Sequence, residues 1–306
     1  MKMKKKHRVK EFIRKLHHKK GMRWMANVGF MIILPVVGLY AHFIEPKLVK
    51  VSNIRIPIPK LPKSFNRFRI VQISDLHYGP TNKSVKFFEK CIRKINQLKP
   101  DLVALTGDYV QWDTTHLRIL TTMLAKIKAT STLAILGNHD YGVCHAGEPA
   151  SDPVDYQEVI DEFQKQGIRV LHNEVAHIEK ENEVLNVVGI GDYWTSHFNP
   201  EKAFSGKKET AFATIVLCHN PDGIDSLKNY PFNLMLSGHS HGGQVSFPFL
   251  GPLSVPVKNR KHRRGLHLVD KGDKKWLYTN RGLGYIFKAR LLSRPEITCL
   301  ELIDAT

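Results

Sequence analysis

Three apolar stretches alternate with two helical patterns early in the chain: RFRIVQISD (67–75), DLVALTGD (101–108) and STLAILGNHD (131–140). Between them, residues 82–98 and 115–128 carry apolar side chains at helical spacing. Short apolar strands that alternate with amphipathic helices predict an α/β fold. The length of 306 residues and a hydrophobic content of 42% allow a large globular body and exclude a wholly disordered or collagen-like chain.

The later part of the sequence continues the strand pattern. We expect strands within LNVVGIGD (185–192), ATIVLCHN (213–220) and FNLMLSGHSH (232–241). Residues 265–280 predict a hairpin around Lys271-Gly272-Asp273, and ITCLELI (297–303) predicts a closing strand.

Polar side chains follow five of these apolar stretches, at the point where each strand is expected to end. They are Asp75, His77, Asp108, Asn138, His219, His239 and His241. In α/β sheets the carboxyl ends of parallel strands form the ligand-binding edge, so these side chains are expected to converge. A single His at a strand end is usually a satisfied or surface residue, but five strand ends with ligand-type side chains favour a metal site.

The number and type of these side chains predict two metal ions. Seven oxygen and nitrogen donors are too many for one tetrahedral zinc, and the four scattered Cys contain no CxxC pair. Two divalent ions that share one carboxylate would clamp a phosphoryl group and lower the pKa of bound water. The donor set favours Mn and also allows Fe or Zn. Gly107, Gly137 and Gly238 precede ligands and permit sharp turns off the strands.

The five blocks D75-L-H77, G107-D108, G137-N138-H139-D140, H219 and G238-H-S-H241 resemble, in this order, the calcineurin-like metallophosphoesterase superfamily. The resemblance covers about residues 66–304. It implies a four-layer αββα sandwich with two central sheets. The stretches SGHSHGGQVSFPFLGPL (237–253) and YTNRGLG (278–284) further resemble the bacterial membrane-linked branch of that superfamily.

The same resemblance implies a role for each site residue. Asp75, His77 and His241 would hold one metal, Asn138, His219 and His239 the other, and Asp108 would bridge them. His139 would face the scissile phosphate as the catalytic residue rather than bind metal. Asp140 is expected to orient His139 or a ligand.

The N-terminus predicts a membrane anchor. Residues 1–23 hold eleven Lys and Arg and one Glu, which is more than half of the formal net charge of +18. Residues 24–44 follow without any Asp, Glu, Lys or Arg, and about 20 apolar residues suffice for a helix to span a bilayer. A buried core helix is the alternative. We therefore expect a basic leader (1–23), a membrane-anchoring or transmembrane helix (24–44), a linker (45–64) and a metallophosphoesterase domain (65–306).

Further basic and polar residues are candidates for substrate contacts. KNRKHRR (258–264) suits an anionic substrate, an anionic membrane surface or a solvated loop equally. Arg281 is a candidate phosphate clamp or a structural residue, and His145 and Glu148 lie in an insertion that could wall the site. No nucleic-acid partner is expected, because most excess charge lies in the leader and the body lacks aromatic and basic interleaving.

These observations predict a membrane-anchored, binuclear-metal phosphohydrolase that cleaves a phosphodiester or pyrophosphate bond, with a lipid-linked substrate and the membrane as partners. Within the branch that it resembles, one activity is hydrolysis of UDP-2,3-diacylglucosamine in lipid A synthesis. The alternatives are a general phosphomonoesterase or nucleotide phosphodiesterase, and an inactive metal-binding membrane scaffold. The expected location is the inner or cytoplasmic membrane. The basic leader favours a cytoplasmic N-terminus, whereas UDP-lipids imply a cytoplasmic active site, so the side that the domain faces stays open.

Overall fold

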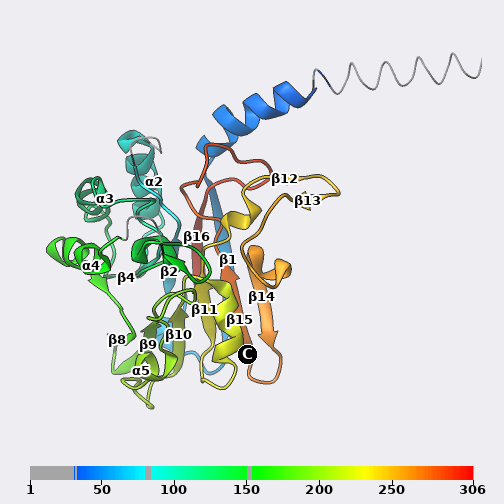
Figure 1. Cartoon of the computed structure of the whole chain (residues 1–306). Helices are drawn as coiled ribbons and strands as arrows, with labels where there is room; N and C mark the ends of the chain where they lie inside the picture. Colours follow the sequence, from blue (N-terminus) through cyan, green and yellow to red (C-terminus); the bar gives the residue numbers. More distant parts are fainter. Residues whose placement is uncertain (1–30, 32, 80–83, 150–153, 306) are drawn as a thin grey trace, which may run out of the picture.

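The computed structural model describes residue 31 and residues 33–79, 84–149 and 154–305. Two six-stranded sheets form the centre of the molecule (Figure 1). The first has the order β1 (Lys50–Ile58), β16 (Glu296–Asp304), β2 (Arg69–Ile73), β3 (Leu102–Thr106), β4 (Ser131–Ile135), β7 (Arg169–Val170). Strands β2, β3, β4 and β7 run parallel, and β16 runs antiparallel to β2.

The second sheet has a parallel centre and two antiparallel edges. Its order is β14 (Gly265–Asp270), β15 (Lys275–Thr279), β11 (Leu234–Ser237), β10 (Ala213–Leu217), β9 (Glu183–Gly189), β8 (Glu174–Lys180). Strands β15, β11, β10 and β9 are parallel, whereas β14 and β8 pair antiparallel to their neighbours. Two short hairpins lie outside the sheets: β5 (Val143–His145) with β6 (Glu148–Pro149), and β12 (Ser246–Phe247) with β13 (Gly251–Pro252).

The two sheets pack face to face. One buried cluster joins side chains of the first sheet, such as Ile70, Leu102 and Leu300, to side chains of the second, such as Val187 and Ile215. Strands buried on both faces need continuous apolar sequence, which explains why β3 and β10 are buried along their whole length.

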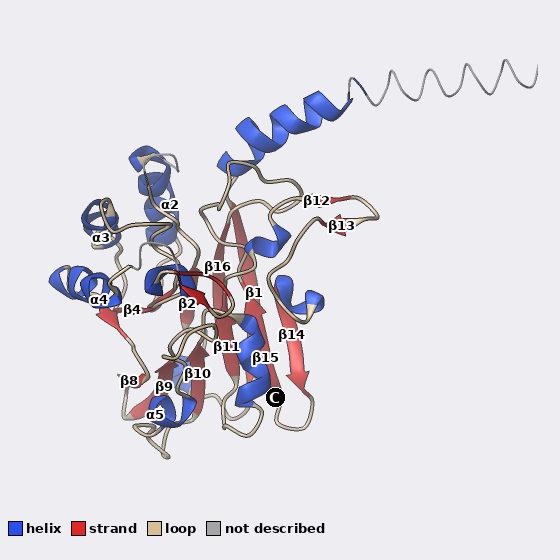
Figure 2. Ribbon diagram, viewed as in Figure 1, coloured by secondary structure: helices blue, strands red, loops and turns tan. Residues whose placement is uncertain are grey.

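Helices cover the outer faces (Figure 2). The first sheet is covered by α2 (Val85–Gln97), α3 (Leu117–Leu124) and α4 (Tyr156–Lys165), and the second by α5 (Pro200–Phe204) and the 3₁₀ segment η5 (Pro221–Leu227). In α2 the buried residues Phe88, Cys91, Ile92 and Ile95 follow the three-to-four-residue spacing of one helix face. Short helical turns complete the chain: η1 (Tyr40–Ile44), η2 (Glu45–Lys47), η3 (Lys63–Phe65), η4 (Asn138–Tyr141), η6 (His241–Gly243) and η7 (Arg260–Arg263).

The α/β fold with mixed sheets expected from the sequence is confirmed, as are the hairpin at 265–280 and the closing strand. The region expected to be a linker differs in part, because β1 occupies residues 50–58 and pairs with β16. Pro57 is tolerated there because β1 is an edge strand.

The predicted anchor falls mainly outside the described residues. Residues 33–39 are helical and lead into η1, and the residues before them are not described except for Met31. Within the part of the chain that the structure describes, no helix combines the length and apolar content needed to cross a membrane.

Candidate metal centre

All seven predicted ligands follow the carboxyl ends of parallel strands, and the two sheets bring these ends together. Asp75 and His77 follow β2, Asp108 follows β3 and Asn138 follows β4, while His219 follows β10 and the last two His follow β11. Backbone hydrogen bonds join these loops: Asp75 N donates to Gly107 O (2.9 Å), and Gly238 N donates to His219 O (2.9 Å). The tertiary fold thus brings together residues up to 166 positions apart in the chain.

The backbone at the site is unusual. Asp75, His77, Asp108, His239 and His241 all adopt positive φ, between 41° and 67°. Non-glycine residues rarely occupy this region, and such strained positions cluster at functional sites. A Cβ at Gly238 would overlap Ser74 Oγ and the Asp75 carboxylate, so only glycine lets the β11 loop approach this close.

Two groups of side chains present convergent donor atoms. Asp75, His77 and His241 form one group, and Asp108, His219 and His239 form the other. Within them His77 Nε2 lies 3.0 Å from His241 Nε2, and Asp108 Oδ2 lies 3.1 Å from His219 Nε2 and 3.6 Å from His77 Nε2. The Asp108 carboxylate therefore stands between the two groups.

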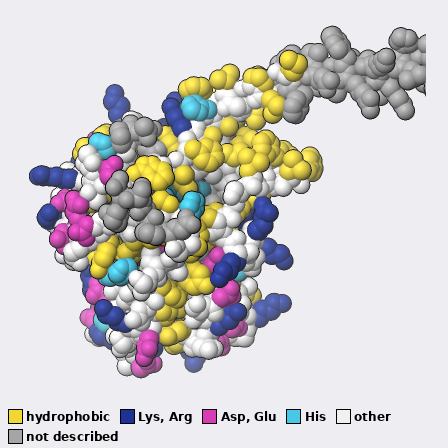
Figure 3. All heavy atoms as spheres, viewed as in Figure 1, with side chains coloured by type: hydrophobic (Ala, Val, Ile, Leu, Met, Phe, Trp, Pro, Cys, Tyr) yellow, Lys and Arg dark blue, Asp and Glu magenta, His cyan; other side chains and the backbone are white. Residues whose placement is uncertain are grey.

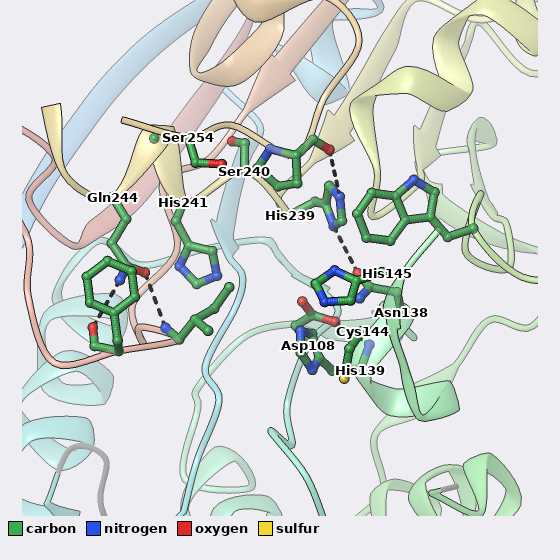
Figure 4. Close-up of a pocket in the computed structure, with 15 residues that line it drawn as sticks. Asp108, Asn138, His139, Cys144, His145, His239, Ser240, His241, Gln244 and Ser254 are labelled. Atoms are coloured by element: carbon green, nitrogen blue, oxygen red, sulfur yellow. Dashed lines mark hydrogen bonds between the residues drawn. The ribbon is translucent and has the colours of Figure 1, made fainter. Parts of the chain in front are cut away.

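The hydrogen bonds around Asn138 and His239 fit a bound cation (Figure 4). His239 Nε2 lies 3.1 Å from Pro256 O, and His239 Nδ1 lies 2.9 Å from Asn138 Oδ1, the amide oxygen left free because Asn138 Nδ2 donates to Val143 O (2.6 Å). A neutral imidazole has one N–H and can donate to only one of these two oxygens. If Nε2 donates to Pro256 O, a cation bound by both Nδ1 and Asn138 Oδ1 would satisfy the remaining pair.

Two further observations agree. Both carboxylate oxygens of Asp75 are buried without a hydrogen-bond partner among the described residues. His219 Nδ1 donates to Thr106 O (2.6 Å), which directs its Nε2 toward Asp108. The donor chemistry of the site therefore fits divalent metal ions.

Burial and the mutual charges set the protonation of these groups. Burial lowers the pKa of His77 and of His239 to about 3, so both imidazoles are neutral, as metal ligands must be. Burial alone would raise the pKa of Asp108, but the neighbouring His219 and His139 hold it well below its usual range. Asp108 is thus a permanent anion at the middle of the site.

His139 differs from the seven in its surroundings. Its backbone N donates to Asp108 Oδ1 (3.0 Å), and its ring Nδ1 contacts Gln111 O (3.1 Å). Burial would lower its pKa, but Asp108 and Cys144 raise it to about 9. Geometry alone also groups His139 with His77 and Asp108 as donors, so its role as a non-ligand stays a prediction.

Asp140 holds the loop that carries the central carboxylate. Its side chain accepts hydrogen bonds from the backbone N of Gly137 (2.9 Å), Asp108 (2.8 Å), Tyr109 (2.8 Å) and Val110 (3.2 Å). The expectation that Asp140 orients a ligand therefore corresponds in the structure to positioning of Asp108 through its backbone.

The remaining candidates lie farther from the donors. Arg281 places its Nε 3.9 Å from Glu296 Oε2, and its backbone N donates to the same carboxylate. His145 lines a cavity of about 260 Å³ beside the metal groups, whereas Arg281, Glu148 and the 258–264 loop are not among the residues that line it. Cys144, Trp194, Ile286 and Phe287 form other parts of its wall.

Asp192 and Arg290 are two of the buried charged residues that the sequence analysis did not identify. Asp192 is fully buried at the end of GIGD after β9, and burial raises its pKa to about 6. The same strand-end pattern that pointed to the predicted ligands could have found it. Arg290 is also fully buried and lies 3.4 Å from His241 Nδ1, but its irregular segment carries no signal.

The comparisons with known proteins bear on this site. The profile of the calcineurin-like phosphoesterase family matches residues 68–243. The chain belongs to this family. The family uses a binuclear metal centre, and the two donor groups described above are its candidates in this chain. The expectation that the chain is a metal-dependent phosphoester hydrolase is confirmed by the family and by its named relatives.

Three relatives illustrate the range of the family. UDP-2,3-diacylglucosamine pyrophosphatase LpxG of Chlamydia muridarum is 32% identical, over 89% of this chain and 95% of that protein. Phosphodiesterase YaeI of Escherichia coli is 32% identical, over 86% of this chain and 92% of its own. A transmembrane protein with metallophosphoesterase domain of Danio rerio is 30% identical, over 90% of this chain and 62% of that protein.

Replacement of Arg290 by Met is expected to lower the free energy of unfolding by about 3 kcal/mol or more. Arg290 donates to the backbone O of Ser293 (2.8 Å), Gly284 (2.5 Å) and Gly282 (3.3 Å), and each of these buried carbonyls would lose a donor. Urea unfolding of the metal-loaded protein measures the change. Arg294→Met is the control, since Arg294 is exposed and donates to Leu48 O; an equal urea midpoint for both variants would contradict the prediction.

Proposed function

We propose that this phosphoesterase is membrane-anchored and hydrolyses a phosphodiester or pyrophosphate bond of a lipid-linked substrate, with UDP-2,3-diacylglucosamine as the specific candidate. The observation that carries the proposal is full-length similarity to a protein named for this pyrophosphatase activity, together with a site at which the predicted donor side chains converge. The apolar segment 24–44 supports the anchor, because it would hold the site at a bilayer surface.

In this proposal Asp75, His77 and His241 would hold one metal, Asn138, His219 and His239 would hold the other, and Asp108 would contribute to both. Two divalent ions supply Lewis-acid stabilisation of the phosphoryl group and a water of lowered pKa; Mn is the first choice and Fe or Zn the alternatives.

Residues of the chain would supply proton donation and positioning. His139 lines the cavity, and Asp108 and Cys144 raise its pKa to about 9 in the metal-free protein, so it is placed to donate a proton to the leaving oxygen. Asp108 and Asp140 connect the loop after β3 to the loop after β4. Asp108 accepts a hydrogen bond from His139 N, and Asp140 accepts from Asp108 N and from Gly137 N. In a preorganised site of this kind the reaction requires little reorganisation free energy.

A general phosphodiesterase is the second candidate, favoured by the similarity to a protein named phosphodiesterase over 92% of its length. The two candidates differ in substrate. Protein purified in detergent with Mn²⁺, Fe²⁺ or Zn²⁺ is tested on UDP-2,3-diacylglucosamine, on a nitrophenyl phosphodiester and on a phosphomonoester. The first proposal predicts release of UMP and the lipid 1-phosphate at a kcat/KM well above that for the other two. Equal or higher kcat/KM on the small diester would favour the second candidate.

Removal of metal is expected to abolish all of these activities. A chelator strips the ions, and the protein is then assayed with single metals added back. Activity should return only with metal, in proportion to the metal content measured per chain up to two ions. Full turnover by protein shown to contain less than one ion per chain would contradict the binuclear proposal.

Deletion of residues 1–39 separates the anchor from the catalytic body. The cut must lie before Ala41, because Ala41 O accepts from Arg290 N (2.9 Å) and Glu45 Oε1 accepts from Ser293 N (2.7 Å). Hydrolysis of a soluble diester is expected to stay within about twofold, while turnover of the lipid substrate in bilayers falls at least about tenfold, because the site loses its high local concentration at the surface. Unchanged turnover in bilayers would contradict a role for the anchor.

A further inference from the structure

An apolar surface stands beside the cavity and has no packing partner in the described structure. Figure 3 shows hydrophobic side chains gathered along the N-terminal helix and over the β12–β13 hairpin. Phe249 and Leu250 at the hairpin tip are exposed to 108% and 86%, and Leu253, which follows β13 at the hairpin base, is exposed to 70%. Large exposed apolar patches on a protein mark interaction sites.

The hairpin and the helix belong to one continuous surface. Arg290 N donates to Ala41 O, which joins the end of the helix to the 286–292 segment. That segment joins the base of the hairpin, since Ser246 N donates to Leu291 O (2.9 Å) and Gln244 Nε2 donates to Phe287 O (2.9 Å). We call this the apolar face; its exposed members are Ile33, Leu34, Val36, Leu39, Phe43, Ile44, Phe249, Leu250, Leu253, Ile286, Phe287 and Leu292.

Positive charges border the apolar face. Lys288 Nζ lies 5.6 Å from the centre of the Phe43 ring, and Arg260 Nη2 donates to Pro252 O (3.1 Å) in β13 of the hairpin. Exposed Lys47 follows η1 in the chain, and exposed Lys258 and Lys261 follow the hairpin. Apolar side chains ringed by Lys and Arg match the acyl region and the anionic headgroups of a bilayer.

The apolar face also reaches the cavity. Ile286 and Phe287 are exposed members of the face and at the same time line the cavity that Asp108, His139 and His241 also line. A lipid in the bilayer could thus place its acyl chains against Ile286 and Phe287 while its phosphate enters the cavity toward the candidate metal ligands.

We propose that the β12–β13 hairpin inserts its tip residues Phe249 and Leu250, with Leu253 beside its base at the membrane surface, into the same lipid bilayer that receives the N-terminal apolar segment, and so holds the mouth of the cavity at the headgroup level. The occupant of the apolar face is therefore an anionic lipid bilayer. Six of its apolar members lie within the uncharged run of residues 24–44, and the basic border complements anionic headgroups. The inference concerns attachment, so it does not depend on which phosphoester is the substrate.

The depth of the hairpin in the membrane is the direct test. Full-length Phe249→Trp protein is reconstituted in vesicles of phosphatidylcholine and phosphatidylglycerol, with lipids brominated at defined acyl positions as quenchers. Phe249 makes little contact with the body, so the substitution is not expected to disturb the fold. Leu268→Trp, on β14 and 42% exposed, is the matched control, and the parent with its four Trp is the baseline.

The added fluorescence of Phe249→Trp is expected to be quenched most by bromines near the headgroup end of the acyl chains, and that of Leu268→Trp not at all. Absence of quenching in the Phe249→Trp variant, with the signal of Leu268→Trp equally unaffected, would overturn the proposal. A blue-shifted emission of the Phe249→Trp variant in detergent that rises with protein concentration, without lipid quenching, would also overturn it in favour of a second copy.

A functional test keeps the two proposals apart. Leu250→Asp, compared with Leu268→Asp, is expected to leave hydrolysis of a soluble diester unchanged and to lower turnover of a bilayer-borne phosphodiester lipid at least about tenfold. Equal turnover by both variants in bilayers would contradict the role of the hairpin. Failure of UDP-2,3-diacylglucosamine as a substrate would overturn only the substrate proposal, because quenching is measured without any substrate.

Discussion

Asp108→Ala is expected to lower kcat/KM at least about 10³-fold and to reduce the metal content from two ions per chain to one or none. Asp108 Oδ2 lies within reach of His77 and His219, one from each donor group, so it is the group placed to offset the repulsion of two cations. The decrease in kcat/KM caused by Asp108→Ala should exceed the decrease caused by alanine replacement of any other single ligand.

The measurement is metal analysis and steady-state kinetics on the Ala variants of all seven ligands, with circular dichroism to check folding. Asp113→Asn is the control, because Asp113 is exposed in the same loop and its carboxylate accepts a hydrogen bond from Thr115 N. An Asp108→Ala variant that keeps two ions and a near-normal rate would disprove the bridging assignment.

His139→Gln is expected to keep both metal ions and to lose about 10²- to 10⁴-fold in kcat, the usual contribution of a positioned proton donor. Its proton is held by Asp108 and Cys144, which raise the pKa of His139 to about 9 against the effect of burial. Substrates with a nitrophenyl leaving group need little protonation and should lose less than substrates with an alkyl leaving group.

The leaving-group series is the decisive readout, because a merely structural loss would slow all substrates alike. His262→Gln serves as the control, since His262 lies in η7 and does not line the cavity. Loss of one metal ion in His139→Gln would show that His139 is a ligand, as its place beside His77 and Asp108 allows.

The apolar periodicity determined most of the sheet structure. β3 and β10 are buried along their whole length. A strand that is buried on both faces requires an almost uninterrupted apolar sequence, so the positions of these strands could be predicted from the sequence. The spacing of Phe88, Cys91, Ile92 and Ile95 likewise showed which face of α2 is buried. The strand-end Asp, Asn and His were readable for the same reason, because polar residues stand out where a buried strand stops.

Contacts between distant segments were decided only by the tertiary structure. β1 read as a proline-containing connection, and its pairing with β16 joins residues 246 positions apart, which no local pattern records. Arg290 lies in irregular chain, and its role arises from the carbonyls of three residues that surround it. The apolar face combines three such segments, since Ala41, Leu291 and the hairpin meet through backbone hydrogen bonds. Sequence alone determined the donor set and the strands that carry it, because both depend on local residue type. The positions of the loops relative to one another, and the apolar face that they form, depend on packing between distant parts of the chain. Only the tertiary structure determines them.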